Sequence, residues 1–218
     1  MTATLPDTTA TRQAVIDACL WMGRVGINQG TSGNISVRVD DGMLITPSAV
    51  AYAQMTPEMI CKLPLDDAPD PENGLKPSTE WRFHQAILQA RPDVAAVVHA
   101  HPVHATAIAT QRRGIPAVHY MVAAFGGSDV PVAGYALYGG QGLSDNVTGA
   151  LRDRHGCLMA NHGAVVVGPT LERALWRMQE LENLAQVYTV ATTCGEPVLL
   201  SDAEIAEVLV SFEDYGQQ

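Results

Sequence analysis

The sequence contains no apolar run near the roughly 20 consecutive residues that a membrane-spanning helix needs. Its amino-terminal end also lacks the positive charge followed by an apolar stretch that marks a secretory signal. We therefore expect a cytoplasmic protein. The four cysteines, Cys19, Cys61, Cys157 and Cys194, form no CxxC pair. We expect free thiols that are buried or partly buried, because unpaired cysteine behaves as a small apolar residue.

Basic residues are scarce, with 13 Lys and Arg against 23 Asp and Glu and a formal net charge of −10. This balance argues against binding of nucleic acids and of anionic membranes, because both attract clustered positive charge. Internal repeats and low-complexity tracts are absent from the sequence as well. With 218 residues, 47% of them hydrophobic, we expect residues 1–218 to form a single domain whose partners are small molecules or other protein chains.

Helix and strand patterns alternate along the chain. Residues 35–39 and 43–45 flank an Asp-Asp-Gly turn and predict a hairpin. Further strands are predicted at 94–99, 117–119, 130–132, 157–159 and 165–167, and helices at 8–25, 77–91, 102–112, 144–154, 170–195 and 201–215. This interleaving indicates an α/β fold, and the hairpin favours a mixed or mainly antiparallel sheet.

Two histidines, His99 and His101, end the apolar strand at 94–99. Side chains at positions i and i+2 of a strand point to the same face, so both imidazoles project together, as metal ligands do. A simple hydrogen-bonded histidine pair remains the alternative. His162 lies between Asn161 and Gly163 at a predicted turn and supplies a third imidazole. Three imidazoles with an open position are typical of a catalytic zinc, and other divalent first-row metals also suit them.

The other histidines have weaker claims to a metal. His84 follows Glu80 by four residues and has the spacing for a local hydrogen bond, and His104 follows the predicted metal pair. We assign both to supporting structural roles. His119 and His155 carry no pattern that indicates a ligand.

Glu80 opens a predicted helix beside Ser78 and Thr79. A carboxylate there is favoured by the helix dipole, so a helix-capping role is the alternative to catalysis. The same helix start offers backbone N–H groups and two hydroxyls to an anion. The glycine-rich segment 30–34 and the turn at 45–48 offer further donors, although each alone could be an ordinary turn. Together they predict a phosphate cradle built from neutral groups.

These motifs resemble the class II aldolase and adducin family, and the resemblance extends over essentially the whole chain. The matching segments are 30–36, 44–48, 77–81, 98–101, 115–121, 161–163 and 200–205. The His-Tyr-Met segment at 119–121, the short length and the segment 212–216 resemble the sugar-phosphate aldolases within it. The resemblance implies one catalytic domain, with a mainly antiparallel sheet flanked by helices on both faces.

The resemblance also implies residue roles. It implies zinc, with Mn²⁺ or Co²⁺ as alternatives, held by His99, His101 and His162. Glu80 is then the acid/base, and Tyr120 and Tyr215 reach the aldehyde end, the latter from a neighbouring subunit. The implied phosphate ligands are Asn34, Ser48, Ala49, Ser78 and Thr79. Family members are typically C4 homotetramers, and we expect the same assembly here.

The implied reaction is reversible cleavage of a ketose 1-phosphate to dihydroxyacetone phosphate and an aldehyde through a metal-stabilised enediolate. Candidate substrates are the L-fuculose, 5-deoxyribulose and 5-methylthioribulose 1-phosphates. Two positions depart from the family pattern: Ala49 stands where glycine is usual, and Tyr138 stands where the aldolase has phenylalanine. A left-handed backbone at position 49 would strain alanine.

Three alternatives remain at this point. Dehydration of 5-methylthioribulose 1-phosphate and 4-epimerisation of a pentulose 5-phosphate would use a similar site. A non-catalytic, adducin-like binding module would lack the metal histidines, which are present in this chain.

Overall fold

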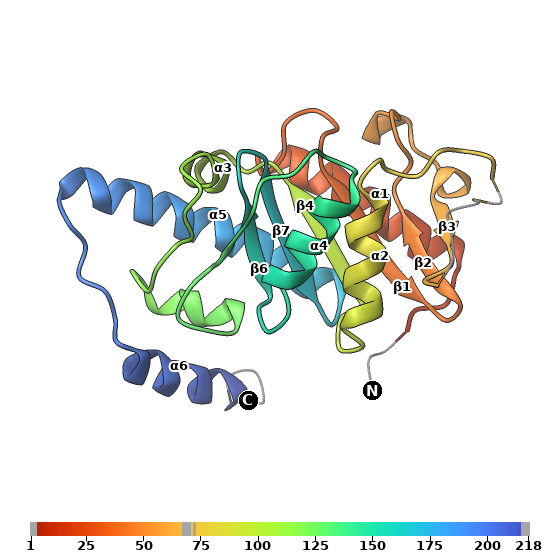
Figure 1. Ribbon diagram of the computed structural model, residues 1–218. Helices are drawn as coiled ribbons and strands as arrows, with labels where there is room; N and C mark the ends of the chain where they lie inside the picture. Colours follow the sequence, from red (N-terminus) through yellow and green to blue (C-terminus); the bar gives the residue numbers. More distant parts are fainter. Residues whose placement is uncertain (1–3, 67–70, 72, 215–218) are drawn as a thin grey trace.

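One sheet organises the computed structural model, which describes residues 4–66, 71 and 73–214 (Figure 1). Within this part of the chain, seven strands lie in the order β3-β2-β1-β4-β7-β6-β5. Every neighbouring pair is antiparallel except β5 with β6. The predicted mainly antiparallel sheet is thus confirmed. The strands are β1 Asn34–Val39, β2 Gly42–Ile45, β3 Cys61–Leu63, β4 Ala96–Ala100, β5 Val132–Ala133, β6 Gly156–Met159 and β7 Gly163–Gly168.

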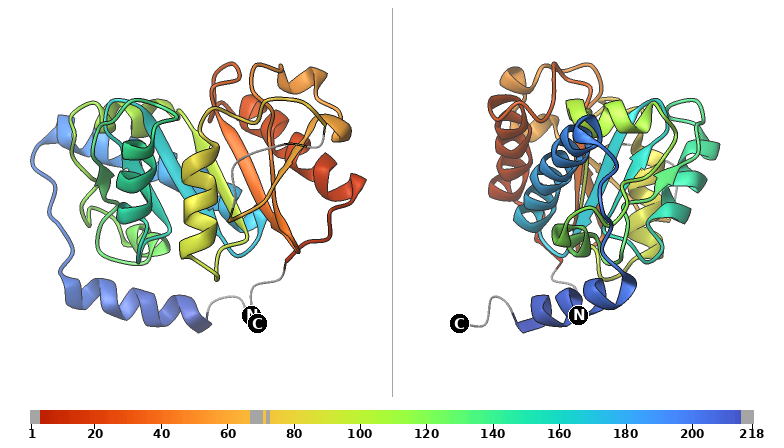
Figure 2. Two further views of the ribbon diagram at one scale, coloured as in Figure 1. Left: turned by 45° about the vertical axis from the view of Figure 1, so that its right-hand side comes forward. Right: turned by 90° about the vertical axis from the view of Figure 1, so that its left-hand side faces the viewer.

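Helices cover both faces of this sheet (Figure 2). One face packs against α1 Thr9–Arg24, α3 Val103–Ala109 and α5 Leu171–Cys194, and the other against α2 Trp81–Ala90 and α4 Gln141–Ala150. The two apolar clusters meet across the central strands: in β4, Val98 belongs to the first cluster and Val97 to the second. Because both faces of β4 are buried, its sequence is apolar without alternation.

The carboxyl-terminal helix α6 Asp202–Asp214 lies apart from the sheet (Figure 1). It packs through Phe212 and its apolar neighbours against η3 Tyr120–Phe125. A capping box begins this helix, because Ser201 Oγ accepts a hydrogen bond from the Glu204 backbone N–H and the Glu204 carboxylate accepts one from the Ser201 backbone N–H.

Several expectations from the sequence are corrected. Residues 117–119 form no strand, and instead His119 caps η3 by accepting a hydrogen bond from the Met121 backbone N–H. The strand expected at 130–132 is an isolated bridge at Val130 followed by the short β5. The helix expected from residue 77 begins at Trp81. Two 3₁₀ turns, η1 Tyr52–Gln54 and η2 Pro57–Met59, precede β3. The strand β3 was not predicted, because it has only three residues and is followed by a proline.

The thiols are free as expected, but they differ in burial. Cys19, Cys61 and Cys157 are buried, whereas Cys194 is exposed, so the burial prediction is wrong at that position. The physical reason is that Cys194 ends α5 where the helix projects beyond the sheet. Across the described residues, none of the helices is both long and apolar enough to cross a bilayer.

Candidate active site

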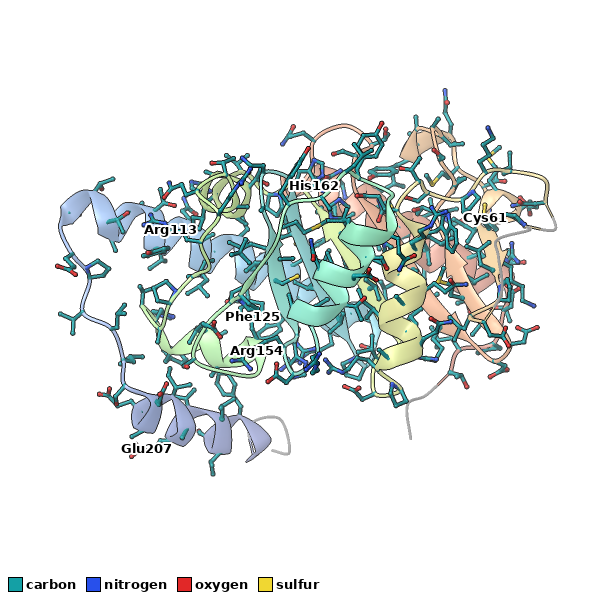
Figure 3. All side chains as sticks on the ribbon, in the orientation of Figure 1. Cys61, Arg113, Phe125, Arg154, His162 and Glu207 are labelled. Carbon is teal, nitrogen blue, oxygen red and sulfur yellow. The ribbon has the colours of Figure 1, made fainter. Side chains whose placement is uncertain are left out.

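Three imidazoles converge where β4 and the β6–β7 hairpin end. His99 is completely buried on β4, His101 follows that strand, and His162 lies in the hairpin connection (Figure 3). Their candidate ligand atoms all lie within 4.8 Å of one another. Antiparallel pairing of β4 with β7 brings the two segments together, because Ala100 lies opposite Ala164.

The arrangement fits a divalent cation. His99 Nδ1 lies 2.9 Å from the Ala164 carbonyl oxygen, which assigns the proton to Nδ1 and leaves Nε2 with a free lone pair. His101 Nε2 lies only 3.1 Å from that atom. Burial lowers the pKa of His101 to about 4, with His99 and His162 adding to the effect, so this imidazole is neutral near pH 7. Neutral imidazoles that converge in this way are ligands for zinc and other first-row metals.

Glu80 faces two of these histidines. Its Oε2 lies 3.1 Å from His99 Nε2, and its Oε1 lies 3.3 Å from His162 Nε2. The side chain is buried, and Oε1 has no hydrogen-bond partner. Glu80 occupies the cap position of α2, as the helix-capping alternative expected, but its side chain makes no cap hydrogen bond. The carboxylate instead points into the imidazole cluster.

Two opposing effects determine the ionisation of Glu80. Burial raises its pKa, but His99, the hydrogen bond from Asn34 and His162 outweigh this effect and lower the pKa to about 2. Asn34 Nδ2 donates to Glu80 Oε2 at 2.9 Å. The amide oxygen of Asn34 lies 2.5 Å from His84 Nε2, so His84 orients Asn34 and contacts Glu80 only through it. His84 thus has a supporting role, which is to position Asn34 rather than to bond Glu80 directly.

A small cavity adjoins the imidazole cluster. It has a volume of about 170 Å³ and is lined by all five predicted phosphate ligands, Asn34, Ser48, Ala49, Ser78 and Thr79, together with Glu80. Backbone hydrogen bonds from Ser48 to Lys76 and from Ser78 to Thr46 hold the two hydroxyl-bearing segments side by side. Ala49 has a φ of 59°, the left-handed conformation in which alanine is strained.

The predicted tyrosines are separated. Tyr138 lines a cavity of about 370 Å³ together with Glu80, His101 and His162. Tyr120 lies on η3 and lines a different cavity of about 710 Å³ between η3, α5 and α6. Phe125, which ends η3, accepts a hydrogen bond from the backbone of His155 at the start of β6, whereas His162 follows the end of that strand (Figure 3). Tyr215 lies outside the described residues.

One buried residue escaped the sequence analysis. Asn28 Oδ1 accepts hydrogen bonds from the His101 backbone N–H at 3.1 Å and from Ser32 at 3.3 Å, and Asn28 Nδ2 donates to Tyr52. Tyr52 in turn donates to the Gly33 carbonyl at 2.6 Å. This network ties the glycine-rich segment to a candidate metal ligand. A lone asparagine carries no sequence pattern that could have revealed it.

His104 links two helices. His104 Nδ1 lies 2.8 Å from Glu182 of α5, whose carboxylate also accepts backbone N–H groups at the start of α3. His104 thus connects α3 to α5 and lies outside the imidazole cluster, which agrees with the supporting structural role expected from the sequence.

Comparisons with known proteins agree with this geometry. The profile of the family described as Class II Aldolase and Adducin N-terminal domain matches residues 13–189. The chain is 49% identical over 203 residues to an L-fuculose phosphate aldolase of Escherichia coli (strain K12), covering 93% of this chain and 94% of that protein. It is 43% identical over 208 residues to a 5-methylthioribulose-1-phosphate/5-deoxyribulose-1-phosphate aldolase of Escherichia coli O45:K1, with 94% and 95% coverage.

Solved structures give the same result. An L-fuculose 1-phosphate aldolase superposes with a TM-score of 0.91 at 33% identity, covering 94% of this chain and 97% of that one. The L-fuculose-1-phosphate aldolase from Thermus thermophilus superposes with a TM-score of 0.73 at 30% identity, covering 87% of this chain and 100% of that one.

Proposed function

This chain belongs to the Class II Aldolase and Adducin N-terminal domain family, and on that premise we propose that it cleaves a ketose 1-phosphate to dihydroxyacetone phosphate and an aldehyde. The observation that carries the proposal is the position of Glu80. Its carboxylate faces the imidazole cluster and lines the walls of both adjoining cavities. A substrate phosphate in the smaller cavity would therefore place the reacting carbons beside Glu80.

The metal site is part of the proposal. His99, His101 and His162 would hold the ion, for which zinc is the first candidate and Mn²⁺ and Co²⁺ are alternatives. When bound, such an ion supplies Lewis-acid polarisation of a substrate oxygen. Asn34 and His84 hold Glu80 in position beside it.

Glu80 is the proposed proton carrier at carbon. In cleavage, the electron pair of the broken carbon–carbon bond stays with the half that carries the phosphate, and that carbon must then receive a proton. A pKa of about 2 keeps Glu80 ionised before substrate binds. We propose that its pKa rises when substrate separates the carboxylate from the imidazoles, because burial then acts without their compensation. The carboxylate then takes up a proton from water and delivers it to that carbon, while the tyrosine that accepts the hydroxyl proton releases it to water.

The second proton leaves the hydroxyl group that becomes the aldehyde. Tyr120 and Tyr215 are the proposed acceptors and donors at that oxygen. Because Tyr120 lines a cavity separate from the Glu80 cavity of its own chain, a Tyr120 that acts at this oxygen would come from a neighbouring copy. We propose the C4 homotetramer implied by the family resemblance as the assembly in which copies meet. The cytoplasmic location stays a prediction.

The phosphate is bound by neutral groups in this proposal. Ser48, Ser78 and Thr79 offer hydroxyls, and the start of α2 adds the positive end of a helix dipole. An acidic chain can therefore hold a phosphorylated sugar. Tyr138 lines the neighbouring cavity and is placed to influence the choice of aldehyde.

The test is a cleavage assay on L-fuculose, 5-deoxyribulose and 5-methylthioribulose 1-phosphates with coupled detection of dihydroxyacetone phosphate. We expect release from at least one of them, loss of release after chelation and recovery on addition of Zn²⁺. A metal-loaded protein that releases no dihydroxyacetone phosphate from any of the three contradicts the proposal, since dehydration and 4-epimerisation release none.

A further inference from the structure

Two residues with unusual backbone conformations meet beside the imidazole cluster. Among the described residues, positive φ outside glycine occurs only at Ala49, Arg112 and Asn161. Arg112 and Asn161 have φ values of 54° and 53°, and they are hydrogen-bonded to each other through Arg112 Nε and Asn161 Oδ1 at 2.8 Å. Such conformations persist where surrounding contacts hold them, and they gather at functional sites.

Asn161 sets the direction of His162. Met159 of β6 pairs with Gly163 of β7, so residues 160–162 form a three-residue hairpin connection with Asn161 at its centre. A left-handed residue is a regular feature of such connections, and asparagine tolerates it better than most residues. The direction in which His162 leaves the hairpin therefore depends on the backbone of Asn161.

Arg112 anchors Asn161 from outside the hairpin. The Asn161 backbone N–H donates to the Ala109 carbonyl at the end of α3 at 3.1 Å, and Arg112 Nε–H donates to the Asn161 side-chain amide oxygen. The same guanidinium lies 5.8 Å from the centre of the Tyr135 ring. Asn161, Tyr135 and His162 all line the 370 Å³ cavity. Arg112 thus joins two walls of that cavity without lining it.

We propose that Arg112 is a positioning residue, which holds the Asn161 conformation and thereby keeps His162 aligned with His99 and His101 for metal binding. The inference rests on the proposed metal site. The planar guanidinium contributes in two ways, because Nε–H makes a directed hydrogen bond while the charged plane contacts Tyr135. Groups that orient a metal ligand typically change metal affinity by 10 to 100-fold when removed.

The first experiment compares Arg112→Gln with Arg113→Gln. Arg113→Gln removes the same charge, but the Arg113 guanidinium lies 5.4 Å from the Tyr188 ring, and neither residue lines the 370 Å³ cavity. Figure 3 labels Arg113 and His162 at separate places. Zn²⁺ affinity is measured by competition with a chromophoric chelator, and ligand geometry by the visible spectrum of the Co²⁺-loaded protein. We expect about tenfold weaker Zn²⁺ binding and an altered Co²⁺ spectrum in Arg112→Gln only. Arg112→Lys, which keeps the charge but loses Nε–H, should follow Arg112→Gln.

Asn161→Gly completes the test. Glycine adopts positive φ freely but has no side-chain amide that could accept the hydrogen bond from Arg112. The double variant Arg112→Gln with Asn161→Gly should therefore bind Zn²⁺ as tightly as Asn161→Gly alone. Equal affinity and spectrum in the two arginine variants, or additive losses with Asn161→Gly, would overturn the inference. Neither readout needs aldol cleavage, so a metal-binding protein that fails the cleavage assay still tests the role of Arg112. A wild-type chain that binds no metal ion overturns both the role of Arg112 and the proposed metal site.

Discussion

The two ends of the sheet divide the functional groups between them. The end that carries His162 brings together three imidazoles, Glu80 and the cavity proposed for phosphate, and Glu80 contacts His99, His162 and Asn34. The end beneath η3 and α6 instead presents aromatic side chains, with Tyr120 48% exposed beside Trp176 and Phe212 around the 710 Å³ cavity. The first end holds the groups proposed for carbon chemistry, and the second presents Tyr120, whose proposed role requires the site of another copy.

Loss of Glu80 should have the largest effect. In Glu80→Gln the shape is kept but proton transfer at carbon is lost, so kcat should fall by about 10³-fold or more. The bound metal, measured by elemental analysis, should remain. Glu207→Gln, on the exposed side of α6, is the matched control and should keep full activity. Unchanged turnover in Glu80→Gln would remove the proposed role.

Loss of the Tyr120 hydroxyl tests whether the two ends cooperate between copies. Tyr120→Phe should lower kcat by about 10²-fold, because proton transfer at the aldehyde oxygen is impaired. Mixing inactive Glu80→Gln chains with Tyr120→Phe chains, followed by subunit exchange, should restore part of the activity, since some sites would then combine intact groups. No gain of activity in a verified mixed oligomer would contradict a site shared between copies.

Acid should weaken the His162 end through His84. Burial lowers the pKa of His84 to about 3, so between pH 6.5 and 3 the unfolded chain takes up a proton that the folded chain refuses. Unfolding free energy therefore falls as pH falls, by at most about 1.4 kcal/mol per pH unit from this residue. Urea unfolding of the chelated protein at pH 7.5 and pH 5 should show a smaller loss in His84→Gln. The same loss in both proteins would contradict this assignment.

The smallest predicted effect concerns Ala49, which lines the cavity proposed for phosphate. Its φ of 59° strains alanine, so Ala49→Gly should stabilise the fold by about 1 kcal/mol. Ala86→Gly within α2 is the opposite control, because glycine in a helix interior destabilises by about 1 kcal/mol. Both are measured by urea denaturation. If Ala49→Gly destabilises as Ala86→Gly does, the left-handed conformation at position 49 is wrong.

Local patterns were sufficient for much of the architecture. The turn at 40–42 predicted the β1–β2 hairpin, and the helix predicted at 170–195 matches α5 within a residue at each end. Short elements were less predictable. The strand β3 and the cap made by His119 depend on partners distant in the sequence, and three residues carry too little periodicity to indicate a strand.

By itself, the sequence determined the candidate ligands, because spacing and family resemblance separate them from other residues of the same type. His99 and His101 end an apolar strand two positions apart, His162 lies at a turn, and Glu80 opens a helix in a segment that matches the family. Only the tertiary structure decided how they meet and what holds them. Strand pairing places His162 beside His99. Asn34 contacts Glu80, and Arg112 contacts Asn161, across long sequence separations. Tyr120 lines a cavity different from the one that Glu80 lines. These relations arise from packing between distant segments, which no local pattern encodes.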